Sequence, residues 1–245
     1  MDNKLIEEVN NNDFFHDFIL FLKRLEEKPI KRTVTGNISL IDITDLQKGF
    51  RQQKIFNEYK KYGWKIRTES EIDFLTQIKV IAEVMHLTYK RKNKIFLSKN
   101  GKGYLYNIDS ITQHCNMVLD YWEGINWEYF SYSPEINGIS AMEILQKNQY
   151  ILWNAFLKKQ DQWFEFKLFC QTIMTHFKLS DYYKNLYDLS FYLNIEYGLL
   201  RKNLVRFGCI ECEERKDKHN ISRIVRIRPT NLGLFIFERA IGRFI

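Results

Sequence analysis

Residues 189–204 read LSFYLNIEYGLLRKNL, and apolar side chains recur in them where a helix-turn-helix buries such residues: Leu189, Leu193, Ile195, Leu200 and Leu204. Ser190 is a small residue at the position where the two helices would cross. The second helix must leave the first at about 90–120° through a turn of about three or four residues, and a small residue at the crossing makes that angle possible. The stretch therefore predicts one helix over residues 186–193 and a second from Tyr197 to Phe207.

The segments that flank this stretch extend the pattern. Residues 205–210 (VRFGCI) lead into a hairpin over residues 210–228, and Thr230-Asn231-Leu232-Gly233 follows it. Over about residues 163–245 the chain resembles bacterial winged helix-turn-helix regulators, in which a Leu-Thr-x-x-Gly step follows the wing. Gly198 inside the expected third helix and Ser190 in place of the commoner alanine depart from the family pattern. The resemblance implies that the third helix enters the major groove of DNA.

The outward positions of this third helix and the tip of its wing supply the candidate DNA-binding residues. Arginine and lysine bond guanine edges or phosphates, and asparagine pairs with adenine. Glu196 shares the outward face of the helix, and the wing tip would lie over the DNA backbone or the minor groove. The candidates are Tyr197, Arg201, Lys202, Asn203 and Arg206 on the helix, and Arg215, Lys216, Lys218 and His219 on the wing.

The basic charge of the chain is concentrated in the same region. Residues 201–245 hold eleven Lys and Arg against five acidic residues, which is +6 of the net charge of +7. This distribution favours contact with a polyanion. A competing interpretation is that Glu211 and Glu213 on one wing strand form cross-strand ion pairs with Arg226 and Arg228 on the other. Such pairs contribute about 0.2–1 kcal/mol each and would neutralise part of the patch.

The first third of the chain predicts a second unit of the same kind. The pattern predicts helices over residues 14–25, 40–46 and 72–87, a short strand over 30–34 and a hairpin over 87–97; residues 47–70 form a polar stretch. Residues 29–38 (PIKRTVTGNI) are similar to a segment of uncharacterised bacterial and plasmid proteins with winged-helix character. The order of these elements is typical of a winged helix-turn-helix.

This first unit is a weaker candidate for reading DNA. The outward residues of its third helix include Glu71, Asp73 and Glu83, which a phosphate backbone would repel, and only the hairpin tip, residues 90–94, is strongly basic. Homodimerisation or binding of a protein partner through this unit therefore stays open beside DNA contact.

A repeated step after each hairpin connects the two units. Ser98 and Thr230 are each followed three residues later by a glycine and then by an apolar helix start. The hydroxyl is a natural helix N-cap, and the glycine would let the new helix pack closely. We therefore expect a mainly α fold with small β-hairpin wings. Tandem winged-helix domains over residues 1–107 and 161–245 would be joined by a helical connector over 108–160, whose aromatic segment 127–137 is expected to pack in a core.

Other features limit the classes of protein. No apolar run approaches the roughly 18 residues of a membrane span, and residues 1–12 are acidic and Asn-rich, unlike a secretion signal. Four cysteines do not make a disulfide scaffold, which favours a reducing cytoplasm. Cys209 and Cys212 form a lone C-x-x-C that would point to opposite faces of a strand, so no metal site is expected. No catalytic or phosphate-loop motif appears, and we expect neither an enzyme nor a cofactor.

These observations lead to one functional hypothesis and one alternative. The first is a non-enzymatic protein that binds double-stranded DNA selectively through its C-terminal unit, as a transcriptional regulator and in dimeric form. The alternative is an assembly subunit that uses tandem winged helices in a larger nucleic-acid-handling or defence complex, because a fold does not determine a function.

Overall fold

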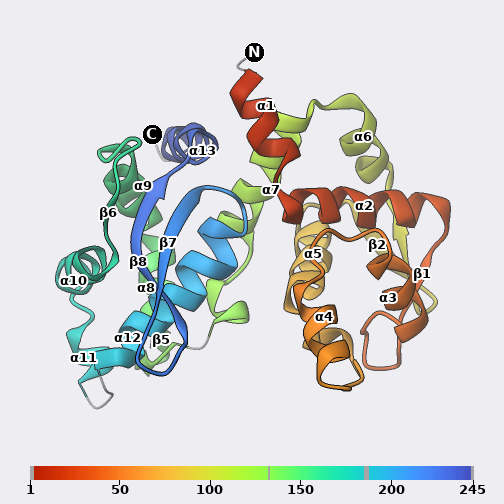
Figure 1. Cartoon of the computed structure of the whole chain (residues 1–245). Helices are drawn as coiled ribbons and strands as arrows, with labels where there is room; N and C mark the ends of the chain where they lie inside the picture. The colour runs from red at the N-terminus through yellow and green to blue at the C-terminus, as the bar shows by residue number, and fades with distance from the viewer. Residues whose placement is uncertain (1–2, 132, 185–187, 244–245) are drawn as a thin grey trace. The chain divides into compact units, whose positions relative to one another are not determined.

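The computed structural model describes residues 3–131, 133–184 and 188–243. The chain is mainly helical with small antiparallel sheets of two or three strands (Figure 1), as the sequence predicted. It divides into two compact units, Met1–Ile125 and Asn126–Ile245. The expected connector, residues 108–160, is not a unit of its own, because its first helix belongs to unit 1 and its later helices belong to unit 2. Within the described residues, no helix has the length and apolar character that a membrane crossing requires.

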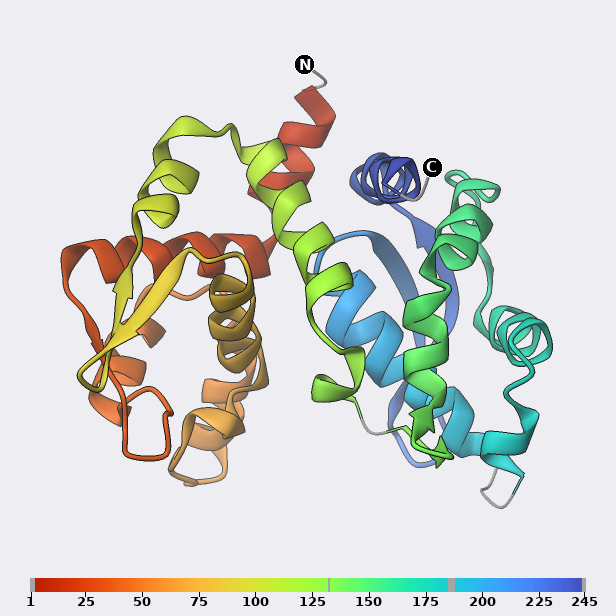
Figure 2. The ribbon, with the colours of Figure 1, turned by 180° about the vertical axis from the view of Figure 1, so that it is seen from behind.

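Unit 1 is built from helices around a three-stranded antiparallel sheet of order β1-β3-β2, which Figure 2 shows from behind. Its elements in chain order are α1 (Asn3–Asn10), α2 (Asp13–Glu27), β1 (Ile30–Lys31), α3 (Leu40–Gln47), α4 (Lys54–Lys61), the 3-10 turn η1 (Glu69–Glu71), α5 (Asp73–Val84), β2 (Thr88–Arg91), β3 (Lys94–Leu97), α6 (Lys99–Asn107) and α7 (Ser110–Gly124).

The predicted elements of unit 1 occur in the predicted order. The side chain of Asn12 caps α2 by accepting a hydrogen bond from Phe15 N at 2.7 Å, and Phe14, Phe18 and Leu22 of this helix are buried. The Ser39 hydroxyl caps α3 by accepting a hydrogen bond from the backbone amide of Asp42 at 3.3 Å, as expected of a serine N-cap. The polar stretch 47–70 also contains a helix, α4, which the sequence analysis did not assign.

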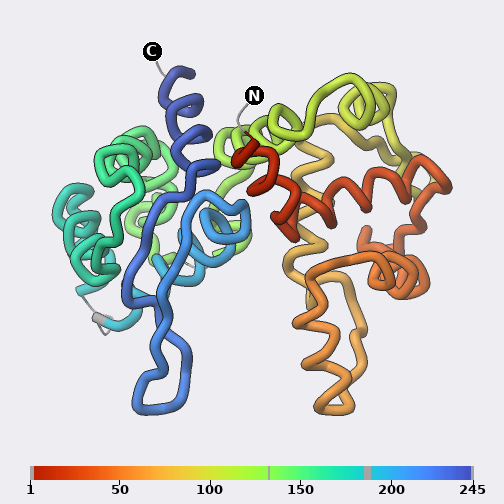
Figure 3. Tube along the Cα trace, turned by 45° about the horizontal axis from the view of Figure 1, so that its top comes forward, coloured from red at the N-terminus to blue at the C-terminus, as the bar shows by residue number. Residues whose placement is uncertain are grey.

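Unit 2 contains a three-stranded antiparallel sheet of order β6-β8-β7 and a small hairpin, β4-β5. In Figure 3 the β7–β8 hairpin is the long blue loop that extends from the rest of the unit. The elements are the 3-10 turn η2 (Trp127–Phe130), β4 (Glu135–Ile136), β5 (Ile139–Ser140), α8 (Ala141–Lys147), α9 (Gln149–Leu157), β6 (Phe164–Glu165), α10 (Phe166–His176), α11 (Ser180–Tyr183), α12 (Asp188–Asn194), the π-helix η3 (Ile195–Val205), β7 (Ile210–Lys216), β8 (Ser222–Pro229) and α13 (Asn231–Gly242).

The core of unit 2 is aromatic. Trp153 of α9 stacks on Phe237 of α13 with ring centroids 5.1 Å apart, and Phe156 stacks on the same ring at 5.2 Å. Trp127 and Phe130 are buried, which confirms the expected core packing of the aromatic segment 127–137 for these two residues. Tyr129 is 63% exposed, and Tyr132 lies outside the described residues.

The structure differs from the predicted helix-turn-helix at its centre. No turn follows Leu193: α12 runs directly into η3, and Asn194 between them has helical dihedrals, φ −63° and ψ −42°. The prediction of a turn was wrong because Phe191, Ile195 and Leu199, four residues apart, are all buried on one continuous helix. The start of the predicted helix, residues 186–187, lies outside the described residues. A short strand, β6, which no sequence pattern predicted, precedes α10.

The two units repeat one order of elements. Unit 1 runs α2, β1, α3, α4, α5, the β2–β3 hairpin and α6, and unit 2 runs α9, β6, α10, α11, α12 with η3, the β7–β8 hairpin and α13. The strand that precedes the second helix pairs with the last strand of the hairpin in both sheets. Both units therefore share one topology.

The helix after each hairpin is capped as predicted. The Ser98 hydroxyl accepts a hydrogen bond from Gly101 N at 2.9 Å, and the Thr230 hydroxyl accepts one from Gly233 N at 2.8 Å. The same two hydroxyls donate to the backbone carbonyls of His86 and Gly208, which lie in the turns just after α5 and η3. In each unit, one hydroxyl thus links the start of the helix after the hairpin to the turn that precedes the hairpin.

The two glycines of these caps permit a close approach of backbones. A Cβ at Gly101 would lie 2.3 Å from the carbonyl oxygen of Leu87, and one at Gly233 would lie 1.9 Å from that of Cys209. The same carbonyls accept hydrogen bonds from the two capping residues, at 2.9 Å and 3.1 Å. The expectation that each glycine lets the new helix pack closely is confirmed.

Candidate nucleic-acid interface

The helix that carries most of the candidate residues is the π-helix η3. Its buried apolar side chains are spaced by four and five residues, which suits a helix with i→i+5 hydrogen bonds; they are Ile195, Leu199, Leu200 and Leu204. Gly198 lies where a Cβ would come within 2.1 Å of the Ser131 hydroxyl oxygen. This glycine therefore allows η3 to lie against the segment that follows η2.

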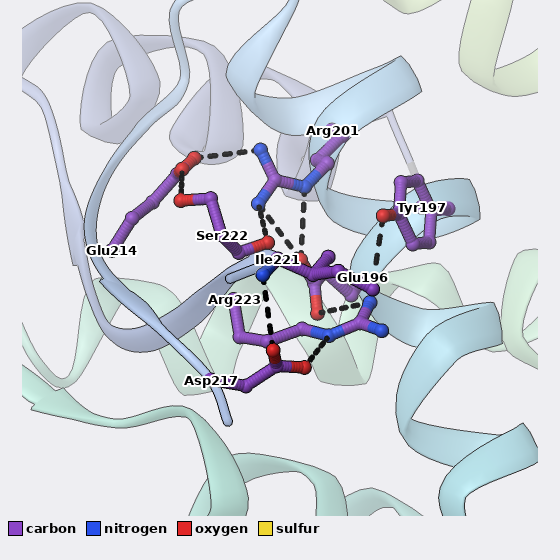
Figure 4. Close-up of polar contacts among 8 residues, drawn as sticks. All are labelled: Glu196, Tyr197, Arg201, Glu214, Asp217, Ile221, Ser222 and Arg223. Atoms are coloured by element: carbon purple, nitrogen blue, oxygen red, sulfur yellow. Dashed lines mark hydrogen bonds and ion pairs between the residues drawn. The ribbon is translucent and has the colours of Figure 1, made fainter. Parts of the chain in front are cut away.

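Arg201 is held by two carboxylates rather than pointing freely into water (Figure 4). Its Nε and Nη2 lie 3.0 and 2.8 Å from one carboxylate oxygen of Glu196, and its Nη1 lies 2.6 Å from Glu214. The Glu196 residue is 2% exposed. Burial acts to lower the pKa of Arg201, but hydrogen bonds to Glu214 and Glu196 outweigh it and the pKa is raised. The guanidinium is thus engaged inside the protein.

A second guanidinium joins the same cluster. Arg223 of β8 lies 3.5 Å from Asp217 through its Nε, and its Nη1 lies 3.4 Å from the Tyr197 hydroxyl and 4.0 Å from Glu196. The cluster of two arginines and three carboxylates, counting Glu214, carries a formal charge of −1. The charge of Arg201, which was expected on the cationic flank of the helix, is therefore balanced by carboxylates.

Three of the four remaining candidates on the helix are buried or half-buried, and Tyr197 is exposed. The ammonium of Lys202 donates to the carbonyl oxygen of Phe130 at 3.1 Å, Asn203 is buried and Arg206 is half-buried. Tyr197 is 42% exposed. The prediction of an unobstructed basic helix face was wrong for Arg201, Lys202 and Asn203. Two carboxylates bind Arg201, a backbone carbonyl accepts a hydrogen bond from Lys202, and Asn203 is buried.

The wing strands form the cross-strand ion pairs of the competing interpretation. Glu211 faces Arg228 and Glu213 faces Arg226 in the register of β7 and β8, and both pairs are in contact. The Arg228 guanidinium also lies 4.8 Å from the centroid of the Trp163 ring. This last contact could not be predicted from the sequence, because the two residues are far apart in the chain.

The tip of the wing retains exposed cations. Arg215, Lys216, Lys218 and His219 are exposed, and Arg215 pairs with Glu213 at 3.0 Å. Among the residues that the structure describes, no carboxylate lies at ion-pair distance from Lys216 or Lys218. The tip therefore presents positive charge to the solvent.

The loop at this tip is closed by one carboxylate. Asp217 accepts backbone hydrogen bonds from His219 at 2.8 Å and from Ile221 at 3.0 Å. The bond from Ile221, together with the other N–H donors and Arg223, lowers the pKa of Asp217. Asp217 thus orders the tip while its charge is partly balanced by these donors.

The tip of the β2–β3 hairpin in unit 1 also carries exposed cations. Arg91, Lys92 and Lys94 are exposed, whereas Lys90 pairs with Glu83 at 2.7 Å. Over the described ranges, no acid forms an ion pair with the first three of these cations. Exposed positive charge on the hairpin tip is thus a shared feature of the two units.

The cysteines offer little reactivity. Cys209 is buried, and burial, only partly offset by Arg201, raises the pKa of Cys212 to about 12. No group of three His, Cys, Asp or Glu side chains suited to a metal ion occurs in the described part of the chain.

A comparison of the chain with protein-family models, with curated proteins and with solved structures finds no match. A function for this chain is therefore proposed from its own residues, distances and charges.

Proposed function

We propose that this protein is a non-enzymatic protein that binds double-stranded DNA by placing its basic wing tips on the phosphate backbone. The observation that carries the proposal is the pair of hairpin tips with exposed cations, Arg91, Lys92 and Lys94 in one unit and Lys216 and Lys218 in the other. Lysine and arginine on an exposed tip can contact phosphates whatever the base sequence, and each contact releases counterions from the DNA. The order of elements in both units, typical of winged helix-turn-helix domains, supports the same proposal.

The helix η3 has a smaller role in this proposal than the sequence suggested. A guanidinium that is bonded to Glu196 and Glu214 has few donors left for guanine, and Lys202 is engaged by a carbonyl. Phosphate contacts orient a protein on DNA but carry no direct sequence information. A regulatory role would then take its selectivity from the shape and deformability of the DNA.

A matched pair of double variants tests the wing. Lys216→Ala with Lys218→Ala removes two exposed cations from the tip, and Lys158→Ala with Lys167→Ala removes two exposed cations elsewhere in unit 2. Binding of a labelled duplex is followed by fluorescence anisotropy at low salt. We expect about tenfold weaker binding for the tip variant and less than about twofold for the control. Equal binding by both variants would reject the wing as the interface.

An assembly subunit is the second candidate, favoured by the neutralised face of η3. A face on which Arg201 and Arg223 are balanced by carboxylates suits a protein partner better than a polyanion. Analytical ultracentrifugation with and without duplex separates the two candidates. Self-association with no duplex binding at low salt would favour assembly, and a duplex complex would favour the first proposal.

A further inference from the structure

Two aromatic rings of unit 1 are stacked on each other in the solvent. Tyr62 and Trp64 are 57% and 62% exposed, and their ring centroids lie 5.0 Å apart with an interplanar angle of 30°. Tyr59 meets Trp64 edge to face at 5.9 Å. We call Tyr62 and Trp64 the aromatic platform.

The exposure of this indole sets it apart from others in the chain. Trp122, Trp127 and Trp153 are buried, as expected for side chains whose burial contributes much of the hydrophobic stabilisation. Trp64 instead leaves most of its surface in water although it is held in place. Its packing contributes little to a core, so binding is the better explanation for an ordered ring pair at this position.

The backbone fixes the platform at the end of α4. Tyr62 is the C-cap of this helix, Gly63 follows with φ +67°, and the amide of Trp64 donates to the carbonyl of Tyr59 at 2.8 Å. A surface groove of about 690 Å³ adjoins Trp64, and its lining includes Tyr59, Trp64, Lys65, Arg67 and Glu71. The platform is thus a preformed surface beside a groove.

Positive charge surrounds the platform. Residues 54–67 hold five basic side chains and one acidic side chain, Glu58, which is a net charge of +4. The groove lining adds one carboxylate, Glu71, which accepts a hydrogen bond from the backbone amide of Arg67 at 3.0 Å. The ammonium of Lys61 lies 5.3 Å from the centroid of the Tyr62 ring. An uncharged apolar partner would not require this charge, whereas a polyanion with flat rings matches both features.

We propose that the aromatic platform binds single-stranded nucleic acid. Unpaired bases stack on the exposed faces of Tyr62 and Trp64, and Lys61, Lys65 and Arg67 hold the flanking phosphates. Base–aromatic stacking combined with a basic groove is the general mode of single-strand binding, and it tolerates many sequences. This site is separate from the wing tips and needs unpaired bases, which a closed duplex does not offer.

Fluorescence and anisotropy titrations of the full chain test the proposal. Labelled oligo-dT and oligo-rU of 15 nucleotides and a labelled duplex are the probes. Trp64→Ala removes the ring, Trp64→Phe keeps a flat ring, and Tyr106→Ala removes another exposed aromatic side chain of unit 1 as the control. Circular dichroism verifies that each variant is folded.

We expect at least one of the two oligonucleotides to quench the tryptophan fluorescence of the wild-type chain. The affinity for that oligonucleotide should fall about tenfold in Trp64→Ala, return to near the wild-type value in Trp64→Phe and stay unchanged in Tyr106→Ala. Duplex affinity should be the same in Trp64→Ala and wild type. Unquenched fluorescence, or wild-type single-strand affinity in Trp64→Ala, would overturn the platform. If the wild-type chain binds the duplex but neither oligonucleotide, the single-strand proposal fails and the duplex proposal stands. If the wild-type chain does not bind the duplex, the duplex proposal fails.

Discussion

Arg201 and Glu196 lie five residues apart in η3, and the guanidinium donates two hydrogen bonds, of 3.0 and 2.8 Å, to a single carboxylate oxygen. In an α-helix, residues five apart point in directions that differ by about 140°. In a π-helix, with i→i+5 bonding, they come close together. The π-helix therefore brings Arg201 to Glu196, and the DNA contact that we propose rests on the wing tips.

Loss of this pair is predicted to destabilise the protein. Within the described part of the chain, Arg201→Ala leaves Arg223, at 4.0 Å, as the one ion-pair partner of the buried Glu196 carboxylate. Breaking a buried pair is costly, and because the Arg201 side chain is 26% exposed we expect the free energy of unfolding to fall by about 1–3 kcal/mol. Urea unfolding measures this change. Glu214→Ala, which removes the more exposed partner, is the control and should cost less; a fully stable Arg201→Ala protein would contradict the account.

Two glycines of α6 are predicted to respond in opposite directions. Gly101→Ala places a methyl group 2.3 Å from the Leu87 carbonyl oxygen and should cost about 1–3 kcal/mol. Gly103→Ala, whose Cβ would meet no atom closer than 3.8 Å, should instead stabilise the helix by up to about 1 kcal/mol. Thermal unfolding of the two variants gives both values. The same change at Gly233 should destabilise unit 2; equal effects at Gly101 and Gly103 would refute the close approach.

The wing is predicted to lose stability in acid. The pKa of Asp217 is lowered in the folded protein, chiefly by the backbone hydrogen bond from Ile221. A lowered carboxylate pKa contributes stability above the unfolded value of about 3.9, and this contribution is lost as the pH falls through the folded pKa.

Asp217→Asn keeps an acceptor for both amides but removes the charge. The stability difference between wild type and this variant should therefore be larger at pH 7 than at pH 3. Thermal unfolding across this pH range measures the difference. A pH-independent difference would show that the charge does not hold the wing loop.

The thiols are predicted to be slow nucleophiles in the native protein. Burial raises the pKa of Cys170, and it raises the pKa of Cys212 to about 12. Since the thiolate is the reactive form, a thiol reagent at pH 8 should modify the folded chain slowly and the urea-unfolded chain quickly. Rapid modification of Cys212 in the folded protein would be the contrary result.

Much of the fold could be predicted because local signals agree with the structure. Ser98 and Thr230 could be identified as caps from a hydroxyl and a glycine three residues apart. The cross-strand pair of Glu211 and Arg228 could be predicted from strand alternation once the hairpin was assigned. Such features depend on short spacings that the sequence displays directly.

Other features could not be predicted from such spacings. The pairing of Arg201 with Glu196 depends on π-helical geometry, whereas an outward-facing prediction assumes an α-helix. The bond from Lys202 to Phe130 joins residues 72 positions apart. The continuous helix through Asn194 is the exception: it agrees with the local sequence, because residues 193–196 contain neither Gly nor Pro. Tertiary contacts therefore decided which cations of the predicted site stay exposed.

The salt dependence of duplex binding tests the wing account most directly. Anisotropy titrations over a series of salt concentrations give the slope of log K against log salt, which changes by about 0.9 for each phosphate contact. The account predicts that Lys216→Ala with Lys218→Ala reduces the magnitude of the slope by up to about 1.8, while folded Arg201→Ala keeps the wild-type slope. An unchanged slope in the wing variant, with a reduced slope in Arg201→Ala, would contradict it.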